Sequence, residues 1–187
     1  MINLARGASQ YFSTSFIDSD FSKQEIIKYY KTKTDKIQVI YNAVNDGFIY
    51  NENIDWIDKY KVFTPRANNI GTELNDDNLN TFVGEPKTIC TESYIVLGAD
   101  LELNKTSAYN LRKYFTSKFA RFLHSLAKAS QDATSKTYRF VPLQDFTNNS
   151  DIDWSKTIAE IDQQLYKKYN LSEEEIAFVE SMIKPMN

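Results

Sequence analysis

Cysteine, which forms disulfides, and histidine, which together with cysteine binds zinc, are almost absent from this sequence. Its 187 residues include one cysteine, Cys90, and one histidine, His124. A single cysteine excludes an internal disulfide framework and is typical of a reducing compartment, so we expect a cytoplasmic protein. Zinc sites made from cysteine and histidine are excluded as well, because each needs several such ligands.

Glycine and proline are also scarce, with five and four residues respectively. No glycine has another glycine two positions away, so the chain lacks the usual glycine loops that bind dinucleotides or S-adenosylmethionine. It has no P-loop either. The same scarcity argues against a low-complexity or collagen-like chain.

Long apolar runs are absent too. The first residues, "MINLARGASQYFSTSF", lack the apolar segment of a signal peptide, and no stretch of about 18 apolar residues is present to span a bilayer. The overall composition is that of a globular protein, with 42% hydrophobic and 14% aromatic residues. A chain of this length is long enough for one domain with a genuine core. We therefore expect a soluble domain with no membrane partner.

The net charge of -3 conceals an uneven distribution of charged residues. Between Lys105 and Arg139 the sequence has eight basic residues and one acid, Asp132, which is a net charge of +7. The rest of the chain has 14 basic and 24 acidic residues. A basic segment in an acidic protein can create a positive patch that attracts a polyanion, although the same pattern also fits an ordinary solvated helix face.

The first half of the chain is predicted to be mostly extended. Residues 36–50 indicate two short strands joined at an Asp-Gly turn, and residues 53–60 indicate a short helix. Residues 61–65 form the next predicted strand, which a proline ends. The polar, asparagine-rich residues 66–87 are predicted to be one long loop. Residues 88–98 include a run that is apolar on both faces, which is typical of a central strand.

The second half is predicted to be mainly helical. Residues 105–129 carry apolar side chains at three- and four-residue spacing, which predicts one long amphipathic helix. Residues 138–143 indicate a strand near a sheet edge, because they include a proline. After residue 150 the sequence becomes acidic and helical, and Ser172 with Glu175 forms a predicted capping box.

These patterns together predict an α+β fold: a mixed β-sheet domain with one long amphipathic helix and a small C-terminal helical appendix. We assign residues 1–150 to the main domain, with residues 36–150 best supported. Residues 151–187 are expected to form the helical appendix packed on it. The sequence has no internal repeat.

A short acidic motif allows one enzymatic interpretation. Asp77, Glu85 and Lys87 have the order found in metal-dependent nucleases, where two carboxylates hold a divalent cation and a lysine assists the water. In such sites the Glu-x-Lys unit lies on a strand, but here its middle residue is Pro86, which cannot donate to a sheet ladder. The stand-alone nuclease is therefore kept only as a minor alternative.

Four blocks of sequence carry a resemblance to a known family. They are "WIDKYKVFTPRANNIGTE", "GEPKTICTESYIVLG", "FTSKFARFLHSLAKASQDATSKTYRFVPLQDF" and "LYKKYNLSEEEIAFVESMIKPM". In these blocks and in their order, the chain resembles the C-terminal part of bacterial type II restriction-modification adenine methyltransferases, whose specificity domain is TaqI-like. The likeness runs from residue 36 to the C-terminus, and the last two blocks contain its most specific parts.

The resemblance implies a DNA target recognition domain. In that family a separate catalytic half binds S-adenosylmethionine and carries an Asn-Pro-Pro-Tyr/Phe motif that grips the extruded adenine. All four prolines of this chain stand alone, so no Pro-Pro pair exists here. We therefore expect no catalytic residue, metal or cofactor in this chain, which would be part of a DNA methyltransferase or restriction endonuclease. S-adenosylmethionine is expected in a missing catalytic domain, and the expected partners are that domain and double-stranded DNA.

The polar segment "ASQDATSKT" lies where the long helix is expected to meet the following strand, and it is our main candidate for DNA contact. To recognise base edges, a protein needs paired hydrogen-bond donors and acceptors on a rigid support. Contacts to phosphates instead set the affinity for DNA and its salt dependence. From residue chemistry and the resemblance, the expected base-reading side chains are Arg66, Asn68, Asn69, Gln131, Thr134 and Arg139. The expected phosphate contacts are Lys118, Arg121, Lys128 and Lys136. Phosphate is a further possible target for Thr134.

A hypothesis from a different class remains open beside DNA recognition. In it the chain is a protein-interaction or specificity subunit that docks on a catalytic partner and makes no DNA contacts of its own. Co-purification with a separate methyltransferase chain would favour that hypothesis.

Overall fold

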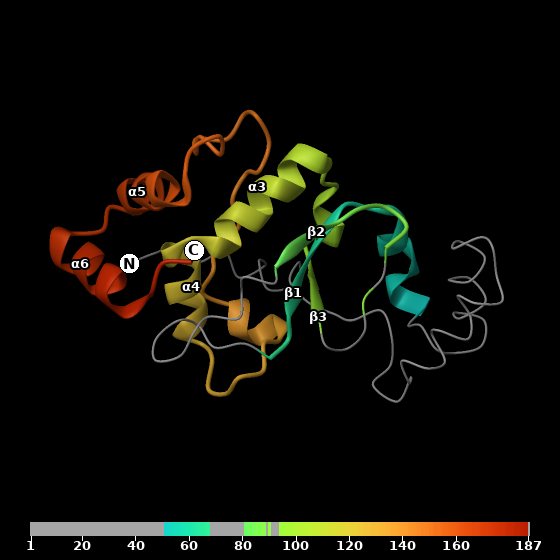
Figure 1. Cartoon of the computed structure of the whole chain (residues 1–187), viewed down its shortest axis with the longest axis horizontal. Coiled ribbons are helices and arrows are strands. Elements are labelled where there is room, and N and C mark those ends of the chain that lie inside the picture. The colour runs from blue at the N-terminus through green and yellow to red at the C-terminus, as the bar shows by residue number, and fades with distance from the viewer. Residues whose placement is uncertain (1–50, 68–80, 89, 91–93, 187) are drawn as a thin grey trace.

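The computed structural model describes residues 51–67, 81–88, 90 and 94–186. These residues form an α+β fold, as predicted, in which a small antiparallel sheet packs beside a group of helices (Figure 1). A 3-10 helix, η2 (Asn51–Asp58), precedes the sheet where a short helix was expected. The two strands predicted within residues 36–50 lie outside the described residues.

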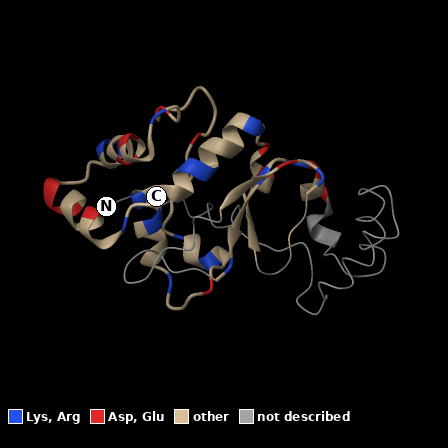
Figure 2. Ribbon diagram, in the orientation of Figure 1, with Lys and Arg blue, Asp and Glu red and all other residues tan. Residues whose placement is uncertain are grey.

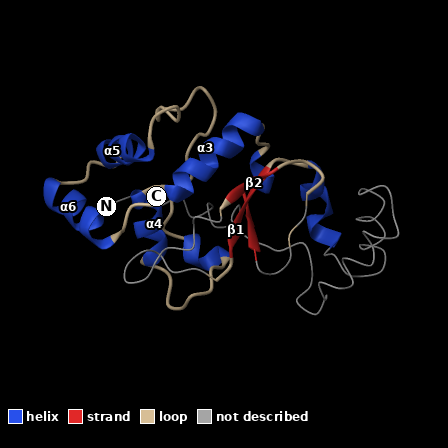
Figure 3. Cartoon of the chain, viewed as in Figure 1, coloured by secondary structure: helices blue, strands red, loops and turns tan. Residues whose placement is uncertain are grey.

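The described sheet, red in Figure 3, has three strands. In it β1 (Lys61–Pro65) lies between β2 (Phe82–Gly84) and β3 (Tyr94–Leu97). Both neighbours run antiparallel to β1, which has its predicted bounds. The described residues do not test whether the strand predicted within residues 88–98 is central; in the sheet that they form, β3 lies at an edge. Its residues are apolar because Ile95 and Leu97 belong to the buried core.

Strand β2 interrupts the segment that was predicted to be one long loop. The sequence does not reveal this strand, because it has three residues and follows a polar, aperiodic stretch. Gly84 in β2 lies so close to the Phe63 ring of β1 that a Cβ atom at Gly84 would overlap it. Phe63 also contacts the ring of Phe82, with centroids 5.3 Å apart. Close packing of one aromatic ring therefore requires glycine at this position in β2.

Two helices occupy the segment that was predicted to be one. Helix α3 (Lys105–Thr116) ends and α4 (Lys118–Ser125) begins at Ser117, whose ψ of 148° is extended. The Ser117 hydroxyl donates to the Tyr114 carbonyl (2.6 Å) and accepts from the Ala120 amide (3.2 Å). Ser117 thus ends one helix and caps the next. The apolar spacing continues across the break, so periodicity alone does not reveal it.

The strand predicted at residues 138–143 is also wrong. A 3-10 helix, η5 (Ser135–Tyr138), and an irregular segment take its place. The Pro142 carbonyl accepts hydrogen bonds from the Tyr114 hydroxyl (2.8 Å) and the Gln144 side-chain amide (3.2 Å). Side chains therefore satisfy this buried backbone group in place of a neighbouring strand.

Two capped helices complete the described chain, α5 (Ile158–Lys168) and α6 (Glu173–Met182). The predicted capping box at the start of α6 is confirmed. The Ser172 hydroxyl accepts from the Glu175 amide (3.2 Å), and the Glu175 carboxylate accepts from the Ser172 amide (2.8 Å). Helices α5 and α6 each pack against α4 (Figure 1).

One buried cluster joins the sheet to each of the α-helices that the structure describes. It includes Val62 of β1, Tyr114 of α3, Leu165 of α5 and Val179 of α6. Tyr114 is fully buried, and its ring lies 6.1 Å from that of Trp154. Among the described helices, none combines the length and the apolar character that crossing a bilayer requires.

Candidate functional site

The polar segment between α4 and η5 lies against the end of β1. An antiparallel bridge pairs Ala67 with Asp132, and the Ala133 amide donates to the Arg66 carbonyl over 2.7 Å. Arg66 follows the central strand, whereas Asp132 lies beyond α4, so the bridge joins two segments that are distant in sequence. It brings the predicted base-reading residue Arg66 next to the segment that contains Gln131 and Thr134.

This segment rests on buried side chains. The His124 ring of α4 stacks on Tyr138 with centroids 4.0 Å apart, and its Nε2 shares a hydrogen bond with the Thr137 hydroxyl (2.7 Å). The Thr137 hydroxyl in turn donates to the Thr134 carbonyl (2.8 Å). Burial, with a smaller contribution from the charge of Lys128, lowers the pKa of His124 to about 3. A neutral, buried imidazole therefore fixes η5 to α4.

Exposed polar side chains project from this buried support. Six predicted contact residues belong to this part of the molecule, and all except the partly exposed Lys128 are exposed. We call this set the junction surface: Arg66, Lys128, Gln131, Thr134, Lys136 and Arg139. Figure 2 shows the basic positions along the loop after α4, in η5 and at the end of β1, with one acidic position in that loop.

Arg66 of the junction surface forms a long ion pair with a neighbouring acid. Arg66 Nη2 lies 4.0 Å from Asp132 Oδ2, and both side chains are about half exposed. An exposed pair at that distance contributes little and leaves the guanidinium accessible to another partner. The Arg139 guanidinium lies 4.7 Å from the centre of the Phe140 ring, which orients it without neutralising its charge.

Two predicted phosphate contacts have a different role in the structure. Lys118 Nζ pairs with the Glu180 carboxylate over 2.5 Å, and Arg121 is 2% exposed and donates from Nη1 to the Lys184 carbonyl over 2.9 Å. Both partners lie in or just after α6. Lys118 and Arg121 therefore hold α6 against α4 and are not included in the junction surface, and their assignment as phosphate contacts stays a prediction. Periodicity placed them off the apolar stripe but did not show that α6 covers this face of α4.

The remaining predicted positions either lie outside the described residues or form ion pairs on the protein surface. Asn68 and Asn69, and Asp77 of the nuclease-like motif, lie outside the described residues. Glu85 Oε1 lies 3.7 Å from Lys105 Nζ, and the Lys87 side chain forms an ion pair with Asp58. Within the described part of the chain, no group of three or more His, Cys, Asp or Glu residues is placed to hold a metal ion. The described residues therefore give the nuclease alternative no further support.

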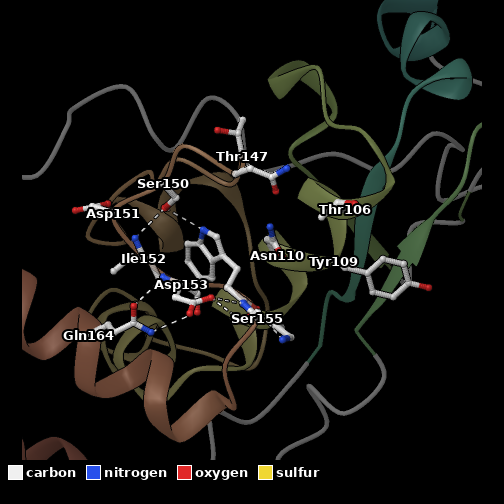
Figure 4. Close-up of a pocket in the computed structure, with 13 residues that line it drawn as sticks. Thr106, Tyr109, Asn110, Thr147, Ser150, Asp151, Ile152, Asp153, Ser155 and Gln164 are labelled. Atoms are coloured by element: carbon white, nitrogen blue, oxygen red, sulfur yellow. Dashed lines mark hydrogen bonds between the residues drawn. The ribbon is translucent and has the colours of Figure 1, made fainter.

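A polar pocket of about 690 Å³ lies between α3 and the loop at residues 147–155 (Figure 4). Two polar side chains that line it from α3 bond to backbone carbonyls of residues 146–156. Lys113 Nζ donates to the Trp154 and Lys156 carbonyls over 2.7 and 3.0 Å, and Asn110 Nδ2 donates to the Phe146 carbonyl over 2.9 Å. These bonds explain how the loop is held on α3. The sequence analysis did not predict this pocket, and the polar run "TNNSDID" is the signal that lies in it.

Comparisons with protein-family models, with curated proteins and with solved structures found no match to this chain.

Proposed function

We propose that this chain is the DNA sequence-recognition domain of a type II restriction-modification enzyme, an adenine methyltransferase or endonuclease, and that it positions a separate catalytic domain on the target site. The observation that supports this proposal best is the Ala67–Asp132 bridge. Through it, Arg66 lies next to the 128–139 segment, and residue chemistry together with the resemblance predicts DNA contacts in both.

The junction surface combines the two kinds of contact that sequence-specific DNA binding needs. Arg66 and Arg139 have the forked donors that pair with guanine, and the Gln131 amide suits adenine. Thr134 suits a thymine methyl group or a phosphate. Lys128 and Lys136 suit phosphates, which fix the register of the protein on the duplex but carry no sequence information. One acid, Asp132, lies among these residues and leaves the set with an excess of positive charge.

Catalysis is assigned to another domain under this proposal. The chain has no glycine loop and no Pro-Pro pair, so S-adenosylmethionine and the extruded adenine would be bound by the catalytic domain. The single cysteine fits a cytoplasmic enzyme of bacterial defence. The domain described here would contribute affinity for the duplex and choice of sequence.

Duplex binding measured as a function of salt tests the proposal. A labelled duplex of about 25 base pairs covers more than two helical turns, and its fluorescence anisotropy is followed as the full chain is added. We expect the logarithm of the affinity to fall linearly with the logarithm of salt concentration, with a slope of about -0.9 for each phosphate contacted. Undetectable binding at low salt for every duplex tested would overturn the proposal.

Variants distinguish DNA binding through the junction surface from a general effect of positive charge on DNA affinity. Lys136→Ala should weaken binding to all sequences alike and reduce the salt slope by about one contact, whereas Arg139→Ala should relax preference at one base pair. Lys167→Ala is the matched control, because Lys167 is an exposed lysine on α5 outside the junction surface. An equal loss in Lys136→Ala and Lys167→Ala would contradict the assignment of the site.

A further inference from the structure

Helices α4 and α6 enclose an apolar groove that the junction surface does not include. The groove has a volume of about 440 Å³, within the size range of pockets that bind ligands. Its lining is largely aromatic and aliphatic and comes from α4, from the turn after α5 and from α6; it includes Phe119, Phe122, Tyr169, Leu171, Phe178 and Val179.

Large apolar side chains extend from the groove onto the surface. Phe178 of α6 is 55% exposed, and its ring meets that of Phe122 edge to face with centroids 5.9 Å apart. Met182 and Leu126 are also exposed. Each follows one of these phenylalanines by four residues, which places it on the same side of its helix. A single exposed apolar residue is ordinary, but two such pairs on adjacent helices make a continuous apolar strip.

The walls of the groove are fixed in place. The Lys118–Glu180 ion pair and the bond from Arg121 to the Lys184 carbonyl tie α6 to α4. Below them, the Phe119 ring stacks on Tyr169 with centroids 5.0 Å apart. A preformed groove lowers the entropy that a partner loses on binding, because these side chains are already ordered.

The charge beside the groove is negative. Glu174 and Glu175 line it, Glu173 precedes them in an exposed position, and its lining in the described part of the chain contains no lysine or arginine. The backbone hydrogen bond from Ser172 holds the pKa of Glu175 below its ordinary value, so this carboxylate stays ionised in mild acid. Acids at a helix N-terminus also offset the helix dipole, but that role does not account for the exposed Phe178 beside them.

We propose that this groove binds an amphipathic helix of a partner protein, with apolar side chains flanked by lysine or arginine. Such a helix would place its apolar face on the Phe122–Phe178 strip and its basic residues against Glu173 and Glu174. The acidic rim of the groove, formed by Glu173, Glu174 and Glu175, would repel an anionic membrane surface. It also disfavours a second copy of this chain, since a two-fold contact through the groove would bring two acidic rims together.

Peptide binding by the full chain tests this proposal. The probe is a labelled peptide of about 18 residues, or five helical turns, with leucine at positions i, i+3, i+4 and i+7 and lysine between them. A second peptide replaces each lysine with glutamate. We expect saturable binding of the lysine peptide and binding roughly tenfold or more weaker for the glutamate peptide, because like charges then meet at the rim. Failure of the lysine peptide to bind would overturn the proposal.

Variants of the protein test whether the peptide binds in the groove between α4 and α6. Phe178→Ser should reduce binding of the lysine peptide roughly tenfold or more, as expected for loss of an aromatic anchor. Tyr109→Ser, which changes an aromatic residue of similar exposure on α3 (46% exposed), should leave it unchanged. Equal effects of the two variants, or a wild-type dimer that Phe178→Ser converts to a monomer, would contradict the proposal. Binding to anionic vesicles that is lost in Phe178→Ser would contradict it as well.

Discussion

His124 and Tyr138 form a buried stacked pair, with ring planes 13° apart and centroids separated by 4.0 Å. This contact joins α4 to η5, and the hydrogen bond between His124 and Thr137 reinforces it. Most of the side chains proposed to contact DNA belong to the segment of residues 128–139, which this contact holds on α4. Their placement therefore depends on an interior contact between two aromatic rings.

Replacing His124 with glutamine should destabilise the fold. The variant loses the stacking contact and alters a buried hydrogen bond, so we expect the free energy of unfolding at pH 7 to fall by about 1 to 3 kcal/mol. Urea denaturation followed by tryptophan fluorescence measures this change. A variant as stable as the wild type would show that the stacked pair contributes little.

The same histidine should make stability depend on pH. Burial lowers the pKa of His124 to about 3 in the folded state, while the unfolded residue has a pKa near 6.5. The unfolded state therefore takes up the proton first, so the stability contributed by neutral His124 is complete above pH 6.5 and is lost as pH falls toward 3. Between pH 7 and pH 5 we expect a loss of about 2 kcal/mol that is absent from His124→Gln.

Asp162 should have the opposite pH dependence. Its carboxylate accepts from the amides of Lys118 and Phe119 at the start of α4, over 3.0 and 2.9 Å, but burial dominates and raises its pKa to about 6. The folded state then binds the proton more tightly than the unfolded state does. The contribution of Asp162 therefore rises as pH falls from 6 toward 4.

Comparing the wild type with Asp162→Asn isolates this effect. From pH 7 to pH 5, the wild type should gain about 1 kcal/mol relative to the variant, which cannot titrate at this position. Urea unfolding at the two pH values provides the measurement. A constant difference between the two proteins would indicate that Asp162 keeps an ordinary pKa.

Ser117 provides a test of the break between α3 and α4. Ser117→Ala removes the cap of α4, so we expect the free energy of unfolding to fall by about 1 kcal/mol. Ser181→Ala is a matched control, because the Ser181 hydroxyl also donates to a carbonyl three residues earlier (2.8 Å) but caps no helix. If both variants lost the same stability, the cap at Ser117 would not be the cause.

Gly84→Ala should destabilise the sheet through one specific overlap. The added methyl group would meet the Phe63 ring, and we expect a loss of about 1 to 3 kcal/mol. Adding Phe63→Leu to Gly84→Ala should recover part of that loss, since the smaller side chain makes room. A double-mutant cycle by urea unfolding measures the coupling, and strictly additive effects would refute this account.

Features that depend on interactions between residues close in the sequence could be predicted. The capping box at Ser172 and the end of β1 at Pro65 both follow from short-range geometry, and both were predicted. The break at Ser117 was missed because the apolar spacing runs through it unchanged. The irregular segment at Pro142 was missed because its carbonyl accepts from the Tyr114 side chain, 28 residues away, as well as from the nearby Gln144 side chain.

The sequence by itself determined the α+β class, the helical C-terminal part and a concentration of positive charge between Lys105 and Arg139. Tertiary structure alone decided which of those charges reach solvent. Packing of α6 covers Lys118 and Arg121, while the bridge at Asp132 adds Arg66 to the exposed set. The physical reason is that exposure depends on which elements pack together, and those contacts join residues far apart in the chain.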